Sequence, residues 1–283
     1  MSFPQSNTVE TPSGKDAAYE NFPVGSWLLP RGLRPVVAVF YQYARAIDDI
    51  ADNPSLPPEE KVRRLDGFAR VIQGAEDVGP GYEKAQAMRD VLLRTGINPQ
   101  HCLDLVSAFK QDAVKLRYRD WPDLIDYCDR SAAPVGRFLL DLHGGSRSGY
   151  AESDALCNAL QVINHLQDCQ DDYRMLDRVY LPLDWMEMED AVVEDLDAGR
   201  STPALRRVID RTLDATETLM VMARRLPRDL HSYRLSLEAS AIVDIADRLI
   251  DRLRRRDPLA QRVELTKAEF AWSCFRGVAT ALV

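Results

Sequence analysis

The stretch after Pro35 reads VVAVFYQYARAIDDIAD over residues 36–52 and predicts an amphipathic helix. A helix turns by about 100° per residue, so Tyr41, Arg45, Asp48 and Asp52 share one face. The opposite side is apolar and carries Val36, Val39, Phe40, Tyr43, Ile47 and Ile50. The helix therefore presents an acidic stripe, flanked by Asp49, and a core-facing surface.

This acidic stripe has two interpretations. It is a solvated helix face on which Arg45 pairs with Asp48 or Asp49, a contact that contributes little stability. Alternatively, Asp48 and Asp52, one turn apart, chelate Mg²⁺. That cation prefers carboxylate oxygens and keeps waters and substrate phosphates in its coordination shell.

A second acidic segment reads DALCNALQVINHLQDCQDDYR over residues 154–174. Asn164, Asp168 and Asp172 recur every four residues, and Gln161 and Asp171 fall within the same arc of about 100°. The rest of this helix is apolar and predicts a core contact. The face is either solvated or a second cation site, in which the neutral Asn164 amide adds a ligand without adding charge.

The two acidic segments together are more informative than either alone. If they face one cavity, they bring six carboxylates together, and this crowding is strongly repulsive in a low dielectric. Mg²⁺ ions held between two acidic helices around a diphosphate would relieve the repulsion and stabilise pyrophosphate as it leaves. The fragment left behind is a carbocation, so the remaining cavity should be apolar and aromatic.

Helical periodicity dominates the rest of the chain. The predicted helices span 33–52, 59–73, 82–95, 99–118, 122–142, 153–176, 203–225, 231–256 and 266–281. Pro134 predicts a kink because proline lacks the N–H of the helical ladder, and Val179 to Leu183 is the one extended candidate. We expect a flexible tail over residues 1–15 and a single all-α domain over 16–283.

Composition and missing motifs exclude several classes of function. The 283-residue chain has a net charge of −8, which disfavours nucleic-acid binding. Its five cysteines form no Cys-x-x-Cys pair, which argues for reduced thiols rather than disulfides or a zinc site. No dinucleotide fingerprint or P-loop is present, and no apolar segment is long enough for a membrane helix. We therefore expect a cytoplasmic protein.

Several motifs, in order over roughly residues 19–255, resemble the squalene/phytoene synthase family of isoprenoid enzymes. Its first aspartate-rich motif resembles YxxxRxxDDxxD at 41–52, and its second resembles QxxNxxxDxxxD at 161–172. Further matches are Asn21-Phe22 with Leu28-Leu29-Pro30, Tyr127-Cys128 with Val135-Gly136, and RxYLP at 178–182. The resemblance implies an all-α isoprenoid synthase bundle with a central cavity.

The resemblance also implies roles for individual residues. The expected Mg²⁺ ligands are Asp48, Asp52, Asn164, Asp168 and Asp172, supported by Asp49 and Asp171. The expected catalytic residues are Arg45 and Arg178, which would hold the diphosphate, and Tyr41 and Tyr127, which would face the cation or leaving group. Further substrate contacts are expected from Asn21, Phe22, Val135, Gly136, Gln161 and Gln167. The alternatives are salt-bridge partners for the arginines and core packing for the tyrosines.

Within the family, Glu20 to Ser26 and Gln161 to Asp168 resemble a bacterial branch of hopanoid biosynthesis. That branch converts presqualene diphosphate and water to hydroxysqualene and pyrophosphate, so NADPH is not expected. Gln167 stands where the family usually has arginine, which fits a substrate with a single diphosphate. Candidates for positioning the water are Gln161, Asn164, His165 and Gln167, and His165 is alternatively a simple hydrogen-bonding residue.

Two rival functions stay open at this stage. One is a head-to-head prenyltransferase that makes presqualene diphosphate, squalene, phytoene or dehydrosqualene. The other is a non-catalytic helical protein that binds prenyl lipids. The expected partners are a prenyl diphosphate, enzymes of the squalene pathway and the inner face of a membrane. The arginine-rich run from Arg248 to Arg262 is either a contact for anionic lipid or a solvated helix end.

Overall fold

The computed structural model describes residues 9–10, 29–144 and 149–280, and in this part the chain is almost entirely helical, as predicted. Its first half contains α1 (Arg34–Asp52), α2 (Pro58–Gln73), α3 (Glu83–Thr95), α4 (Gln100–Asp112), α5 (Trp121–Ser131) and α6 (Ala133–Leu142). Its second half contains α7 (Tyr150–Gln167), α8 (Cys169–Leu176), α9 (Leu183–Met188), η3 (Val193–Asp197), α10 (Pro203–Ala223), α11 (Leu226–Asp229), α12 (Tyr233–Arg255) and α13 (Lys267–Thr280).

Short polar side chains fix where several helices begin. The Asp120 carboxylate accepts a hydrogen bond from the backbone N–H of Asp123 at 2.8 Å and caps α5. Thr202 caps α10 in the same way, and Ser232 caps α12. These oxygens satisfy amide groups that a helix start otherwise leaves without partners. The start of α12 matters for the site, because this helix contributes to the cavity wall.

Two long predicted helices are broken. The helix expected over 122–142 divides at Ala132, and Pro134 stands in the first turn of α6, where a missing N–H costs no ladder bond. The helix expected over 153–176 divides at Asp168. The helix expected over 99–118 was predicted too long, because it ends at Asp112 and the chain turns into a strand.

A small parallel sheet joins the two halves of the chain. Its strands are β1 (Arg117–Tyr118) and β2 (Val179–Pro182), and Arg117 pairs with Val179. The second strand confirms the extended segment predicted around residues 179–183. The pairing holds the segment around β2 against the end of α4, and so sets the positions of Arg178 and Tyr180.

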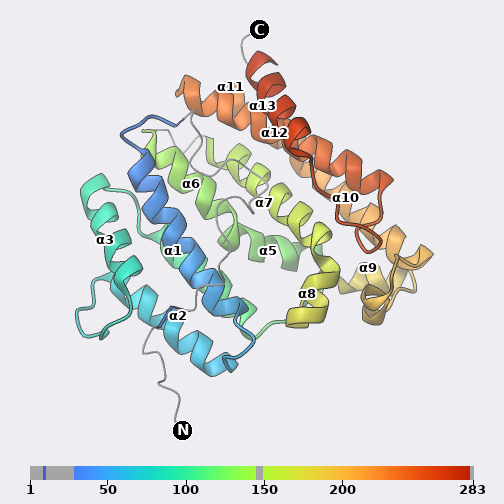
Figure 1. Cartoon of the computed structure of the whole chain (residues 1–283), viewed down its shortest axis with the longest axis horizontal. Helices are drawn as coiled ribbons and strands as arrows, with labels where there is room; N and C mark the ends of the chain where they lie inside the picture. The colour runs from blue at the N-terminus through green and yellow to red at the C-terminus, as the bar shows by residue number, and fades with distance from the viewer. Residues whose placement is uncertain (1–8, 11–28, 145–148, 281–283) are drawn as a thin grey trace.

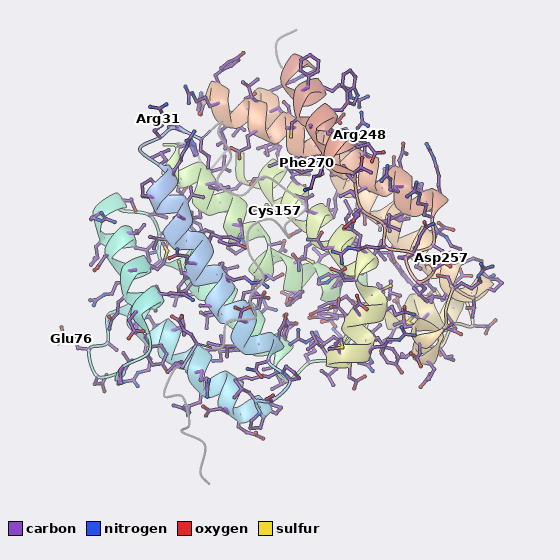
Figure 2. All side chains as sticks on the ribbon, in the orientation of Figure 1. Arg31, Glu76, Cys157, Arg248, Asp257 and Phe270 are labelled. Carbon is purple, nitrogen blue, oxygen red and sulfur yellow. The ribbon has the colours of Figure 1, made fainter. Side chains whose placement is uncertain are left out.

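The helices enclose two hydrophobic cores. One core is built mainly from α1 to α4, and the other mainly from α5, α7, α10 and α12. Figure 1 shows α1 running from the end of the molecule that holds α11 toward α8. Figure 2 shows side chains filling the space between the ribbons, with Cys157 of α7 in the middle and Arg248 and Asp257 at the edge.

Within residues 29–144 and 149–280, no helix combines the length and the apolar character that crossing a bilayer requires.

Candidate functional site

A cavity of about 410 Å³ lies between the two cores. Residues from α1, α4, α5, α6, α7, α8 and α12, together with the segment around β2, line it. The predicted site residues on its wall are Tyr41, Arg45, Asp48, Asp52, Tyr127, Val135, Gly136, Gln161, Asn164, Asp168, Asp172 and Arg178. The fold thus brings together residues up to 137 positions apart in the chain, from Tyr41 to Arg178.

Some predicted site residues do not line this cavity. Asp49 is buried beneath Arg45, and Asp171 is exposed to solvent on α8. The side-chain amide of Gln167 donates a hydrogen bond to the backbone carbonyl of Val263. Asn21 and Phe22 lie outside the described residues.

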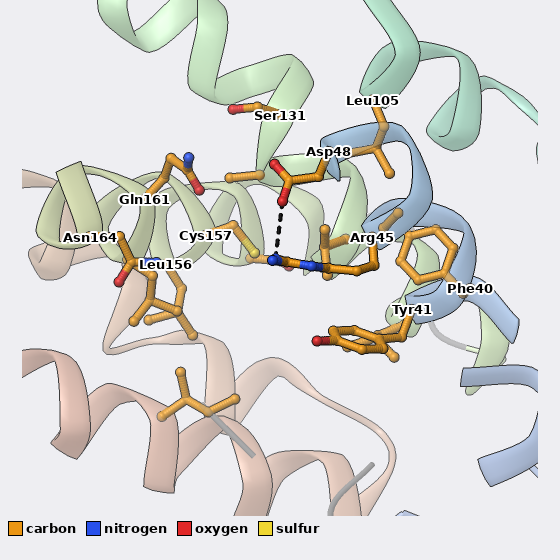
Figure 3. A pocket seen from close by; sticks show the side chains of 18 of the residues that line it. Phe40, Tyr41, Arg45, Asp48, Leu105, Ser131, Leu156, Cys157, Gln161 and Asn164 are labelled. Carbon is orange, nitrogen blue, oxygen red and sulfur yellow. Dashed lines mark ion pairs between the residues drawn. The ribbon is translucent and has the colours of Figure 1, made fainter. Parts of the chain in front are cut away.

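The first acidic motif contains a local ion-pair cluster. Arg45 approaches the Asp48 carboxylate at 3.0 Å through Nη1 and the Asp49 carboxylate at 3.2 Å through Nε. Figure 3 shows Arg45 and Asp48 projecting from α1 toward Gln161 and Asn164 on the opposite helix. Asp49 therefore holds Arg45 from beneath, while Asp48 lies on the cavity wall.

Arg178 connects three elements at the polar end of the cavity. Its Nη1 forms an ion pair with Asp52 at 2.6 Å, and its Nη2 donates to the backbone carbonyl of Ala51 at 2.9 Å. Its Nε donates to the backbone carbonyl of Asp112 at 3.2 Å. Lys61 donates to the Ala51 carbonyl as well, at 2.7 Å. The C-terminal end of α1 is therefore tied to α2, α4 and β2.

Asp112 is a site residue that the sequence analysis missed. Its carboxylate accepts hydrogen bonds from the hydroxyls of Tyr127 and, at 3.0 Å, Tyr180. Burial raises the pKa of Asp112 to about 6, although the Arg178 charge opposes that rise. Asp112 belongs to no acidic run in the sequence, and it reaches the cavity on the face of α4 that also carries Leu105 and Phe109.

The second acidic motif spans a helix break but keeps its register. The backbone N–H of Asp168 donates to the carbonyl of Asn164 at 2.9 Å, and that of Asp172 donates to the carbonyl of Asp168 at 2.8 Å. Burial raises the pKa of the Asp172 carboxyl well above its usual value, and the negative charges of Asp168 and Asp52 raise it further. Because Asp52 belongs to α1, the two acidic motifs lie within electrostatic reach of each other.

His165 lies behind the second motif as a neutral, packed ring. It stacks on Tyr180 with the ring centres 3.6 Å apart, and its Nε2 is 3.2 Å from the amide nitrogen of Gln161. Burial, aided by the Arg178 charge, lowers the pKa of His165 to about 3. At neutral pH this imidazole therefore carries no charge and is a weak proton acceptor.

Most of the rest of the cavity is apolar, and we call this part the apolar wall; Ser131, Ser153 and Cys157 line the cavity as well. The apolar wall comprises Leu29, Val37, Phe40, Ala44, Leu105, Phe109, Ala132, Val135, Leu139, Leu140, Leu156, Leu160, Leu226, Leu230, Leu235, Ala239 and Ile242. Phe40 stacks on Phe138 with ring centres 3.9 Å apart, which fixes its position. A second lining residue that the sequence analysis missed is Glu238, which interrupts this wall on α12.

The opposite end, which we call the acidic end, comprises Asp48, Asp52, Asp112, Asp168 and Asp172 with Arg45 and Arg178. Five carboxyl groups against two guanidinium groups leave an excess of negative charge, which fits hard divalent cations such as Mg²⁺. Within the described residues, no three His, Cys, Asp or Glu side chains are grouped closely enough to hold an ion by themselves. Such a set suits Mg²⁺, which takes one or two carboxylates and completes its shell with water and phosphate oxygens.

The chain was compared with known proteins. The model of the squalene/phytoene synthase family matches residues 16–269. A hydroxysqualene synthase of Rhodopseudomonas palustris is 43% identical over 274 residues, which cover 97% of this chain and 93% of that protein. A hydroxysqualene synthase of Sinorhizobium fredii is 41% identical over 88% of this chain and 85% of its own length. The crystal structure of squalene synthase HpnC from Alicyclobacillus acidocaldarius superposes with a TM-score of 0.72 at 31% identity, covering 84% of this chain and 89% of that one.

Proposed function

The chain belongs to the squalene/phytoene synthase family, and we propose that it is an enzyme that converts presqualene diphosphate and water to hydroxysqualene and pyrophosphate. The observation that carries this proposal is the shape of the cavity between the two cores, with acidic residues at one end and an apolar wall elsewhere. A prenyl diphosphate has the same division between a charged head and a long hydrocarbon chain. The relatives named hydroxysqualene synthase favour this reaction within the family.

The acidic end would bind the diphosphate. Asp48, Asp52, Asn164, Asp168 and Asp172 would hold Mg²⁺, which supplies the positive charge that neutralises the departing pyrophosphate. Arg178 is already oriented by Asp52 and by two backbone carbonyls, so its planar fork keeps its position when the substrate binds. Arg45 is held in the same way by Asp48 and Asp49.

The apolar wall would bind the hydrocarbon chains and protect the carbocation. Excluding bulk water leaves the cation no solvent to react with, so the protein decides which nucleophile reaches it. Tyr41 and Tyr127 both line the cavity, and the Tyr127 hydroxyl donates to Asp112. The aromatic face of either residue would stabilise the cation, and Tyr41 would alternatively hydrogen-bond to the leaving group.

Gln167 supports a substrate with one diphosphate. At this position the family usually has arginine, and here the amide is bound to the Val263 carbonyl. Among the described residues, Arg45 and Arg178 are the arginines that line the cavity. A condensation of two prenyl diphosphates needs a second diphosphate site, so the prenyltransferase alternative is less favoured. A non-catalytic lipid-binding role is less favoured because the named relatives are enzymes.

The proposed substrate partitions into bilayers, so peripheral contact with the inner membrane face is part of the proposal. The arginine-rich run gives little support to this contact. Arg248, Arg252 and Arg254 are held in ion pairs with acidic residues of the chain. Exposed Trp272 and Phe275, which neighbour each other on α13, are a better candidate. Loss of vesicle co-sedimentation in Trp272→Ser and Phe275→Ser variants would support it, and unchanged sedimentation would contradict it.

The proposed reaction can be tested directly with purified protein. Presqualene diphosphate and Mg²⁺ are supplied with and without NADPH, and the products are identified by mass spectrometry. We expect hydroxysqualene in both samples and none when EDTA is added. Farnesyl diphosphate alone is the matched control and should give no product. Presqualene diphosphate or a hydrocarbon formed from farnesyl diphosphate would instead support the prenyltransferase alternative.

A further inference from the structure

Glu238 is a carboxyl group in the apolar wall. It lies in the N-terminal half of α12, and the cavity-lining neighbours on the same helix are Leu235, Ala239 and Ile242. Only 5% of its surface is exposed. Figure 1 shows this part of α12 beside α11, away from α8 and therefore away from the second acidic motif.

The carboxyl group of Glu238 is not satisfied by the protein. Its Oε2 is buried and has no hydrogen-bond partner among the described residues. A buried polar atom without a partner is costly, and a leucine of similar size would pack against this wall without that cost. A carboxyl group in this position therefore indicates a polar ligand that enters the cavity.

Ser131 also lines the cavity with an Oγ that has no partner in the described part of the chain, but a hydroxyl is too weak a base to take a proton from water. The remaining candidates for water binding have partners or lie elsewhere. Gln161 and His165 contact each other, and His165 is uncharged at neutral pH. Gln167 is bound to the Val263 carbonyl. Asn164 and its neighbours belong to the acidic end, where a water would compete with the diphosphate.

We propose that Glu238 binds the water that captures the carbocation and accepts a proton from it. This inference rests on the proposed function and adds the residue that directs the water. Burial alone raises the pKa of Glu238 to about 7. A carboxylate with a pKa close to the working pH is well suited to act as a general base.

The proposed step breaks one carbon–oxygen bond and forms another. The carbon–oxygen bond to the diphosphate breaks, and its electron pair leaves with pyrophosphate. After the cation rearranges, a lone pair of the water forms the new carbon–oxygen bond. One proton of that water passes to the Glu238 carboxylate, which becomes a neutral carboxylic acid and later releases the proton to solvent. The products are an alcohol, pyrophosphate and one proton, and no oxidant or reductant takes part.

The test separates departure of pyrophosphate from capture by water. Wild type, Glu238→Gln and Glu238→Leu are given presqualene diphosphate and Mg²⁺, and pyrophosphate and organic products are measured in the same samples. We expect pyrophosphate release to stay within about threefold of the wild-type rate, because ionisation takes place at the acidic end. The hydroxylated fraction should fall by about tenfold or more, with hydrocarbons in its place. Glu238→Asp should restore part of it.

The control variant is Glu152→Gln. Glu152 also has a buried oxygen without a partner, but it does not line the cavity. Its product distribution should match that of the wild type. A hydroxylated fraction within twofold of wild type in both Glu238→Gln and Glu238→Leu would overturn the inference, as would an equal loss of pyrophosphate and alcohol. Failure of the wild type to form any alcohol would instead refute the proposed function, and with it the inference.

Discussion

The two ends of the cavity differ in whether their charged side chains have partners in the protein. At the acidic end, Arg178 and Arg45 are held by carboxylates and carbonyls, and Asp112 accepts hydrogen bonds from two tyrosines. In the apolar wall, Glu238 is alone among aliphatic side chains. The acidic end is preorganised for a charged group that arrives with its cations, whereas the apolar wall contains a single acidic side chain, Glu238.

This difference divides the reaction between the two regions. Changes at the acidic end should alter how fast pyrophosphate leaves. Changes in the wall should alter what becomes of the cation, or how well the bundle is packed.

The largest effect is expected at the acidic end. Asp48→Asn and Asp168→Asn each remove a carboxylate that lines the cavity, and we expect pyrophosphate release to fall about 1,000-fold in each, because the metal-assisted departure is lost. Release is measured by a coupled pyrophosphate assay at saturating Mg²⁺. Asp171→Asn is the control, because Asp171 is exposed and off the cavity. Near-normal release in both cavity variants would exclude these residues as metal ligands.

A smaller effect, on stability, is expected where Arg178 ties α1 to β2. Arg178→Met loses the ion pair with Asp52 and two hydrogen bonds to backbone carbonyls. We expect the free energy of unfolding to fall by about 3 kcal/mol. This is a low value for the loss of a buried ion pair, because the Asp52 side chain is partly exposed. Urea unfolding measures it. Arg117→Gln is the control, since its partner Asp177 is a surface residue and the pair should contribute under about 1 kcal/mol. Equal losses in both variants would contradict the structural role given to Arg178.

Local periodicity made one half of the site predictable. The spacing of Asp48 and Asp52, and of Asn164, Asp168 and Asp172, follows the helical turn, so each set shares a face without any knowledge of the tertiary fold. The register of the second set even survives the break at Asp168, because the backbone hydrogen bonds continue through it. Pro134 indicated an irregularity close to the break at Ala132. No proline or glycine in the sequence indicates the break at Asp168.

The other half depends on long-range packing. Asp112 and Glu238 belong to no run of acidic residues, and only the assembled bundle brings them to the same cavity as the two acidic motifs. Glu238 left a weak signal, because it interrupts the apolar stretch LSLEASAIV at residues 235–243. Asp49 and Asp171 illustrate the reverse case. They are adjacent to cavity residues in sequence, yet one is buried under Arg45 and the other is exposed to solvent.

The pH dependence of the free energy of unfolding reports on Glu238 in the apolar wall. Burial raises the pKa of Glu238 from 4.5 to about 7, so between these values the folded protein binds more protons than the unfolded chain. Stability should therefore fall as pH rises through this range. Between pH 5 and pH 8 the wild type should lose about 2 kcal/mol more than Glu238→Gln in urea unfolding. The thiol of Cys274 on α13 interacts electrostatically with Glu238. Its pKa is raised above the ordinary value of a thiol, so Cys274 does not titrate between pH 5 and pH 8. Parallel curves for the two proteins would show that Glu238 titrates normally.

The smallest effect is expected where α6 and α7 approach each other closely beside the cavity. A Cβ added at Gly136 would lie 2.2 Å from Oγ of Ser153 and 2.8 Å from Sγ of Cys157. Gly136→Ala should therefore cost about 1–2 kcal/mol, because two small side chains must rotate away from their present positions. Gly149→Ala is the control, since its nearest neighbour, Leu140, is 3.8 Å away.

The double variant Gly136→Ala, Ser153→Ala removes the shorter clash and should recover part of the loss in a double-mutant cycle of urea unfolding. Strict additivity would show that Ser153 is not what limits the space.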